Sequence, residues 1–501
     1  MNILLATLVA PLVTAGLGAL PGPRRPKEAV LLGGLSSTFA LALATAGRYL
    51  AGETPAAFGG ALRVDGLSAL VLVLTAFVGL LSGLYAVGYL ERNERAGFVS
   101  ARRRTELLAL IPAYLAAMLT VSVSNNLGIL WIAVEATTLA SVFLVAFHNR
   151  DTSLEAAWKF LVLGSVGLAF ALLGTVLLFA SGRGALGEEM SALDWTRLLA
   201  HAAQLHPFTV KLAVVFSVIG YGTKAGLAPM HTWKPDAYRE APSPAGVLMA
   251  VGMLNCSLYA LLRVHLVSKA ALGPEFSGRL LLGLGLASVL VATPFVLIQW
   301  NLKRLLAYSS IEHVGIMAVG FGLGGETAAF GALLHMTYHT FAKPVAFFSA
   351  GTLAQLHRSS DFDEIGRGTL ARTPVASGLL LLATLMVTGS PPFGLFFSEM
   401  TILKAGFFGG QHGVTALFLA ALVVLFCGFF YQVGRLVLGE DPGLVLGEDP
   451  GPHRRALPER LDLAMGTTLV AAAAAVVSAF YLPDPLLRLI RAAVRVVESG
   501  A

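Results

Sequence analysis

The chain is poor in charge and almost free of cysteine. Charged residues make up 13% of its 501 residues, and its two cysteines, Cys256 and Cys427, each lie inside an apolar run. Two isolated thiols provide neither a disulfide framework nor the ligand set of an iron–sulfur cluster. We therefore expect no cofactor in this chain, and we expect a non-redox component without a catalytic centre of its own.

Apolar residues take the place of charge. Hydrophobic residues account for 56% of the sequence, and the mean hydropathy is +0.75. About 14 apolar runs approach the roughly 20 residues that a membrane-spanning helix needs. The sequence therefore predicts an all-α polytopic membrane protein of about 14 transmembrane helices, with no large soluble domain. The first run, 1–20, lacks a basic leader, which predicts a retained helix.

Basic residues gather in alternate connections between the apolar runs. With the N-terminus placed outside, the inner connections hold more than twice as many lysines and arginines as the outer ones. The strongest single anchor is the arginine triplet at 102–104. The positive-inside rule thus predicts both termini on the outer side of the membrane. The net charge of +6 reports this topology, and we expect no nucleic-acid partner.

One lysine interrupts an apolar run that begins near Pro207. Lys224 is followed by Gly226 and Pro229, which weaken or break a helix and free backbone carbonyls. Ionisable residues inside a membrane are costly and mark ion paths, although a lysine near a helix end can also snorkel to the interface. We favour a functional role for Lys224, and we include Lys234, shortly after the break, among the candidate residues.

A single glutamate lies in the middle of another apolar run. Glu135 needs a partner there, and Lys224 is the candidate. The alternative is a protonated carboxyl group hydrogen-bonded to a neighbouring helix. We predict that the two side chains approach within reach of a salt bridge or of a single water molecule, because each alone would cost several kcal/mol to bury.

Histidines recur at helical spacing in a third run. His335, His339 and Lys343 follow one another every four residues, which places them on one face of a helix. Imidazoles titrate near neutral pH, so this stripe is suited to relaying protons, with His313 as an extension from the preceding helix. A zinc site is the competing interpretation, but no third ligand lies at a suitable spacing. Ordinary buried histidines are a further alternative.

A second broken helix follows five spans after the first. Pro391 and Pro392 interrupt a run that continues to Glu399. Paired interrupted helices predict an inverted repeat with an ion site in each half, and this pairing would match Lys224 with Glu399. We therefore divide the chain into three N-terminal helices, two five-helix halves and a C-terminal part, with the boundaries 1–106, 107–268, 279–436 and 437–501.

Several of these motifs together resemble a known family. In order along the chain they are Trp131–Leu139, Lys224–Trp233, Ala241–Pro244, Leu306–Gly315, His335–Pro344 and Gly389–Glu399. The chain resembles the antiporter-like, proton-translocating membrane subunits of respiratory complex I and of multi-subunit cation/proton antiporters. Within this group it is most similar to the large membrane subunit of group 4 nickel-iron hydrogenases of the hydrogenase-4 type.

The resemblance implies residue roles and partners. Glu135 would pair with Lys224, and protons would pass along a central hydrated axis to Glu399. The partners would be other membrane subunits and, through them, a peripheral iron–sulfur arm, in a prokaryotic cytoplasmic membrane. One position departs from the pattern, because the eighth helix usually carries a lysine on the axis where this chain has Asn255. An asparagine binds water but cannot carry a proton charge.

The expected function is proton translocation coupled to electron transfer elsewhere in an oxidoreductase complex. Two alternatives remain open. A monovalent cation/proton antiporter, with sodium as the ion, would need oxygen-rich coordination near the broken helices. A non-pumping membrane anchor is the other, and Asn255 is its best support.

Two C-terminal features complete the sequence. An octapeptide occurs twice in tandem, at Leu436–Gly443 and Leu444–Gly451, and we assign it no function. The tail after Pro483 is predicted to be an amphipathic helix that lies on the membrane or on a neighbouring subunit.

Overall fold

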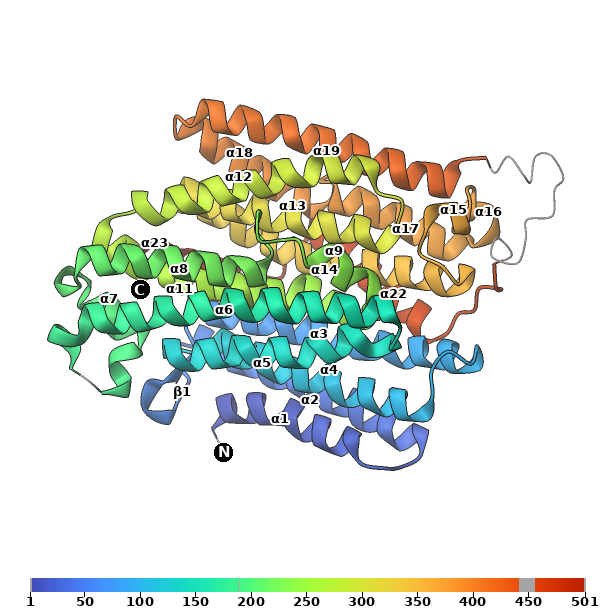
Figure 1. Cartoon of the computed structure of the whole chain (residues 1–501), viewed down its shortest axis with the longest axis horizontal. Coiled ribbons are helices and arrows are strands. Elements are labelled where there is room, and N and C mark those ends of the chain that lie inside the picture. Colours follow the sequence, from blue (N-terminus) through green and yellow to red (C-terminus); the bar gives the residue numbers. More distant parts are fainter. Residues whose placement is uncertain (1, 188, 441–455, 500–501) are drawn as a thin grey trace.

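The computed structural model describes residues 2–187, 189–440 and 456–499. It is a bundle of long helices that run side by side along the long axis of the molecule (Figure 1). Within the described residues, strands are confined to one short hairpin, β1 (Ala56–Ala57) and β2 (Leu62–Arg63). The predicted all-α polytopic membrane fold is confirmed.

The helices follow one another in a simple order. They are α1 (Ile3–Ala19), α2 (Arg24–Leu50), α3 (Gly66–Arg95), α4 (Ala101–Val123), α5 (Leu127–Val145), α6 (Asp151–Leu186), α7 (Trp195–Ala200), α8 (Pro207–Ala225), α9 (Lys234–Glu240), α10 (Ser243–Val247), α11 (Leu254–Leu272), α12 (Glu275–Ile298), α13 (Leu302–Leu323), α14 (Glu326–His357), α15 (Phe362–Ile365), α16 (Thr369–Arg372), α17 (Pro374–Val387), α18 (Gly394–Phe408), α19 (His412–Leu438), α22 (Leu463–Phe480) and α23 (Asp484–Ser499). A π-helical segment, Leu248–Met253, joins α10 to α11.

Eleven helical segments of the described chain are long and apolar enough to cross a membrane. The shorter α1, the 32-residue α14 and the pair α17/α18 would bring the number to the predicted fourteen, which stays a prediction. Two helices begin several residues before their apolar runs, α2 at Arg24 and α4 at Ala101. The first turns of these helices are rich in arginine, lysine and glutamate, which are good helix formers. A hydropathy pattern does not detect such turns because it marks only the apolar residues.

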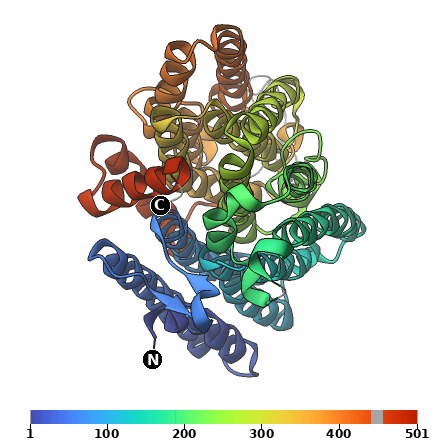
Figure 2. The same cartoon turned by 90° about the vertical axis from the view of Figure 1, so that its left-hand side faces the viewer.

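The centre of the bundle is formed by helices that are buried along most of their length. The apolar windows of α3, of α10–α11 and of α13 are 83%, 100% and 94% buried, whereas those of α2, α12 and α19 are 33% buried. The second set therefore lies at the periphery. Figure 2 looks along the helices, with the N-terminal helices in blue at one edge and α18 and α19 in orange at the other.

The C-terminal helix α23 packs against its own chain. Leu489, Ile490 and Val494 are buried on its apolar face, and Lys269 pairs with Glu498 at 3.0 Å. Its predicted amphipathic character is therefore correct, but the membrane or a neighbouring subunit is not what covers the apolar face. Three exposed arginines lie on the opposite face, namely Arg488, Arg491 and Arg495.

Both ends of the chain lie toward the same end of the bundle, as the two marks in Figure 1 show. The arginine triplet at 102–104 begins α4 at the other end. Following the predicted topology, we call the end that holds the termini the outer end and the opposite end the inner end. The octapeptide repeat falls largely outside the described residues, which stop at 440 and resume at 456.

Glycines allow α12 and α13 to approach closely. A Cβ added to Gly285 would lie 2.7 Å from the backbone nitrogen of Val319, whereas one added to Gly283 on the same helix would meet nothing within 4 Å. Small residues at such positions are the usual basis of helix packing in membranes.

Replacing Gly285 by valine should therefore destabilise the protein by about 1–3 kcal/mol, the usual cost of overpacking. The measurement is thermal unfolding of the purified chain in detergent. Gly283→Val is the matched control because it makes the same change on an open face. Equal unfolding temperatures for the two variants would contradict the predicted close contact.

Candidate functional site

The first helix break is shaped around a buried lysine. α8 ends before Gly226, which has a φ of +77°, and α9 begins at Lys234. A Cβ at Gly226 would lie 2.7 Å from Lys234 Nζ, so only glycine fits both the backbone conformation and the space. The indole Nε1 of Trp233 donates to the carbonyl oxygen of Thr223 at 2.9 Å, which also accepts the backbone N–H of Gly226 at 3.1 Å. This contact ties the segment after the break to the end of α8.

Lys224, at the end of α8, is joined to Glu135 on α5 through a hydroxyl group. Lys224 Nζ donates to Thr138 Oγ1 at 2.9 Å, and Thr138 Oγ1 donates to Glu135 Oε2 at 3.4 Å. Ser165 of α6 donates to the other carboxylate oxygen at 3.3 Å. The ammonium group also lies 4.7 Å from the centre of the Phe160 ring. A single hydroxyl group thus lies between the two charged groups. The sequence predicted a direct salt bridge or a single water molecule at this place.

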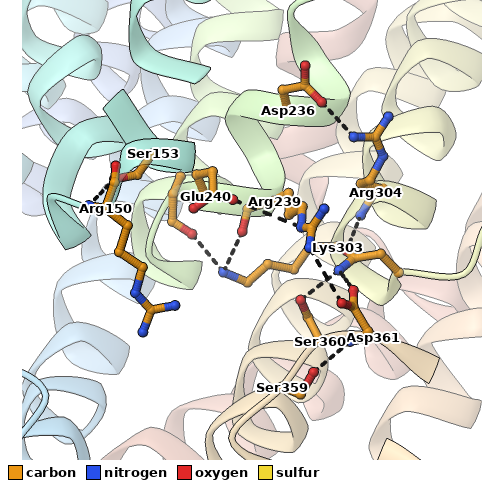
Figure 3. A network of polar contacts seen from close by, with 12 residues as sticks. Arg150, Ser153, Asp236, Arg239, Glu240, Lys303, Arg304, Ser359, Ser360 and Asp361 are labelled. Carbon is orange, nitrogen blue, oxygen red and sulfur yellow. Dashed lines mark hydrogen bonds and ion pairs between the residues drawn. The ribbon is translucent and has the colours of Figure 1, made fainter. Parts of the chain in front are cut away.

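A polar network at the inner end holds α9 in place (Figure 3). Arg304 of α13 pairs with Asp236 of α9 at 2.5 Å. Lys303 Nζ donates to the carbonyl oxygens of Arg239 and Ala241 at 3.2 and 2.8 Å. Because α9 begins at Lys234, this network fixes the helix that carries the buried lysine.

The same network reaches the segment before α15. The Arg239 guanidinium donates to Asp361 Oδ2 at 3.4 Å, and the side-chain amide of Asn301 donates to Ser360 Oγ at 2.8 Å. The contacts of Arg239 and Asp361 therefore tie together segments that come from the two predicted halves (Figure 3).

Three histidines come together on α13 and α14. His313 Nδ1 lies 3.0 Å from His335 Nε2, and the ring centres of His313 and His339 are 4.8 Å apart. His335 Nδ1 lies 2.9 Å from Ser398 Oγ, whose hydroxyl donates to the carbonyl oxygen of Leu395 at 2.7 Å. In the neutral state His335 therefore carries its proton on Nδ1 and accepts a hydrogen bond from His313.

The second helix break is shaped around Glu399. Gly389 has a φ of +66°, and a Cβ there would lie 2.8 Å from the carboxyl carbon of Glu399. Each break therefore holds a left-handed glycine against a buried ionisable side chain. Glu399 lies beyond its break, on the same side as Lys234, whereas Lys224 precedes its break. The predicted match of Lys224 with Glu399 rests on which helices are broken and stays a prediction. Counted from the breaks, Lys234 is the lysine that lies on the same side as Glu399.

The prolines of both breaks lie in the connections between helices. Pro229 is in the segment between α8 and α9, and Pro391 and Pro392 lie between α17 and α18. A proline there removes a backbone donor without interrupting a hydrogen-bond ladder.

Lys343 and Asn255 also face the interior. Lys343 Nζ donates to Ser309 Oγ at 2.7 Å, and Asn255 Nδ2 donates to Thr340 Oγ1 at 3.2 Å. Both side chains are fully buried, and so is nearly all of Glu312. Asn255 thus points to α14 and not to lipid, as expected of a position on the central axis.

Six basic residues lie within the apolar runs of the sequence, and three of them are fully buried: Lys224, Arg263 and Lys343. The others are exposed, namely Lys159, Lys211 and Lys404.

The sequence did not single out the hydroxyl partners. Thr138, Ser309 and Ser398 each touch a candidate residue, but serine and threonine are common in membrane helices and usually bond to their own backbone. The usable signal was spacing: Thr138 is three residues after Glu135, and Ser398 directly precedes Glu399. Within the described ranges, no three His, Cys, Asp or Glu side chains are grouped so as to hold a metal ion.

Comparison with known proteins gives this arrangement a family. Residues 124–425 match the family described as NADH:quinone oxidoreductase/Mrp antiporter, TM. Residues 56–98 match the one described as NADH-Ubiquinone oxidoreductase (complex I), chain 5 N-terminus.

Individual relatives agree with this match. The chain is 37% identical to a hydrogenase-4 component F homolog of Methylacidiphilum infernorum, over 76% of this chain and 78% of the relative. It is 32% identical to NADH-quinone oxidoreductase subunit N of Desulforudis audaxviator, over 77% and 74% of the two chains. A chain of respiratory complex I from Thermus thermophilus superposes with a TM-score of 0.75 at 26% identity, covering 98% of this chain and all of that one.

Two broken helices with buried ionisable side chains between them define an antiporter-like membrane subunit. The chain belongs to the NADH:quinone oxidoreductase/Mrp antiporter family, as its sequence resemblance predicted. The structural relative from Thermus thermophilus is a chain of a multi-subunit respiratory complex.

Thr138 gives a direct test of the link between Glu135 and Lys224. Thr138→Val keeps the shape but removes the bridging hydroxyl, so we expect proton transport by the assembled complex to fall at least about tenfold, within the range for loss of one proton-transfer group. Thr138→Ser should restore it.

Thr137→Val is the control. Thr137 is equally buried, and its hydroxyl bonds only to its own helix, at the carbonyl oxygen of Val134. Proton transport is followed with a pH-sensitive dye in proteoliposomes that hold the complex. Equal transport by the Thr137 and Thr138 valine variants would contradict a bridging role.

Proposed function

We propose that this chain translocates protons across a prokaryotic cytoplasmic membrane, within an oxidoreductase complex whose electron transfer drives the movement. The observation that carries this proposal is a row of ionisable side chains across the bundle, all of them buried except Glu135, which is half-buried. We call it the central row, and its members are Glu135, Lys224, Lys234, Lys343, His339, His313, His335 and Glu399.

Contacts along the central row suit proton transfer. The Thr138 hydroxyl joins Glu135 to Lys224, and imidazoles with Ser398 lead from His339 toward Glu399. In the middle, Lys234 Nζ and both ring nitrogens of His339 have no hydrogen-bond partner among the described residues. Buried polar atoms of this kind are bound by ordered water in proteins, and water would complete the row.

The charges of the central row favour protons over sodium. Three lysines line the path, and an ammonium group repels a metal cation in a low-dielectric interior, whereas a neutral amine accepts a proton. Lys234 and Lys343 lie close enough to interact electrostatically. Protonation of one therefore disfavours protonation of the other, so a proton arriving at one end displaces charge along the row.

Glu135 is placed to receive the signal from outside the chain. It is half-buried on α5, between Ile132 and Leu139, which are 62% and 55% exposed. This face meets lipid or another membrane subunit, and through such subunits we infer contact with an iron–sulfur arm. A change of charge next to Glu135 would alter the attraction that holds the proton of Lys224.

The test compares two lysines in the complex that contains this chain. Lys343→Met deletes a buried charge of the central row, and we expect it to lower the number of protons moved per electron while electron transfer continues. Lys404→Met is the control, because Lys404 is exposed on α18. Proton movement and electron transfer are measured together in proteoliposomes, with and without sodium.

Glu135→Gln should behave like Lys343→Met, because it keeps the shape and removes the charge that Thr138 bridges to Lys224. Unchanged proton movement in both variants would identify a non-pumping anchor. A strict sodium requirement would instead identify a cation antiporter.

A further inference from the structure

A second set of polar residues leads away from the central row along α11. Asn255, Tyr259 and Arg263 are spaced by four residues, so they share one face of the helix. All three are fully buried. Two steps of four residues span about 12 Å along a helix. The set begins where Asn255 bonds to Thr340 of α14, beside the histidines, and ends where Arg263 pairs with Asp65, the N-cap of α3.

Hydroxyl groups continue this set to a carboxylate. Tyr259 Oη lies 3.0 Å from Ser68 Oγ on α3. Arg263 Nη2 donates to Asp65 Oδ1 at 2.8 Å, to Ser68 Oγ at 3.0 Å and to Tyr259 Oη at 3.1 Å. The backbone nitrogen of Ser68 donates to the same carboxylate oxygen at 2.8 Å. We call Asn255, Tyr259, Ser68, Asp65 and Arg263 the α11 row.

Arg263 is held as a fixed charge. Its guanidinium carbon lies 4.2 Å from the centre of the Trp195 ring and 4.4 Å from that of Tyr259. Its Nε and Nη1 have no hydrogen-bond partner among the described residues, although the side chain is fully buried. If the ion pair served only to hold two helices together, these two donors would stay without a hydrogen bond, which costs free energy. Donors along a proton path would instead bind water.

Asp65 stands where the α11 row meets solvent. It caps the N-terminus of α3 outside the membrane-spanning helix, and its side chain is 16% exposed. Burial acts to raise the pKa of Asp65, but the neighbouring Arg263 charge and hydrogen bonds from Arg263 and Ser68 hold that pKa below its usual value. The carboxylate is therefore ionised at neutral pH and passes on an acquired proton readily.

We propose that the α11 row is a release route that carries protons from the central row to the outer end of the bundle. Each hydroxyl accepts one proton and gives up its own, so no bond other than O–H is formed or broken. Asn255 holds water at the start of the route, Asp65 hands the proton to solvent, and Arg263 remains charged and keeps Asp65 ionised between transfers. This inference rests on the proposed proton transport.

Tyr259→Phe tests the route without disturbing the stacked ring. It removes the hydroxyl and keeps the aromatic contact with Arg263, so the fold and the ion pair with Asp65 are retained. We expect the rate of proton movement to fall at least about tenfold in proteoliposomes that hold the complex.

Tyr85→Phe is the matched control. The Tyr85 hydroxyl is also buried and bonded, to the carbonyl oxygen of Phe348 at 3.0 Å and to Thr352 at 3.2 Å, but it lies off the α11 row. Asp65→Asn should act like Tyr259→Phe, and Asp65→Glu should largely restore proton movement.

The outcomes separate this route from the proposed function. Normal pumping by Tyr259→Phe together with impaired pumping by Lys343→Met would overturn the route and leave the function standing. Normal pumping by both would overturn the function itself. A loss of assembled complex in Tyr259→Phe that accounts for all of the lost flux would also overturn the route, because the hydroxyl would then be structural.

Discussion

The structure depends on how the cost of burying charge is met. A lysine in a low-dielectric interior needs a partner, and a carboxylate would be the strongest one. Here Lys224 and Lys343 bond instead to the hydroxyls of Thr138 and Ser309. A hydroxyl stabilises an ammonium group less than a carboxylate does, and it can itself accept and donate protons. Weak partners therefore keep the buried amines able to exchange their protons.

The two helix breaks are the second part of the same solution. A continuous helix would offer no free backbone groups and no room at the centre of the bundle. Gly226 and Gly389 turn the chain and leave space for Lys234 and Glu399. The breaks thus place one basic and one acidic group at comparable positions. The order of each glycine and its charged residue is visible in the sequence, but the contact between them is a property of the folded chain.

The sequence predicted the elements better than the contacts. The hydropathy pattern and the free-energy cost of burying an ionisable side chain were enough to choose the candidate residues. These are Glu135, Lys224, His335, His339 and Glu399, all of which lie inside helices that are otherwise apolar. The predictions were weakest where the signal was a common residue. Thr138 and Ser398 look like ordinary helix residues until their neighbours are known.

The cover of the apolar face of α23 could not be predicted for the same reason. It depends on the surface against which the helix packs, which is a tertiary property and leaves no trace in local composition or periodicity. The match of Lys224 with Glu399 stays a prediction.

The inner-end network has a consequence for how such a protein can work. Asp236, Arg239 and the carbonyl at Ala241 are held by Arg304, Asp361 and Lys303, so α9 is anchored from several directions at once (Figure 3). Sliding or tilting α9 would break several charged contacts together, which a single protonation event is too weak to do. The network therefore holds α9 as a fixed part of the frame around the buried side chains. In the proposed mechanism, changes of charge would therefore pass from one buried side chain to the next without movement of α9.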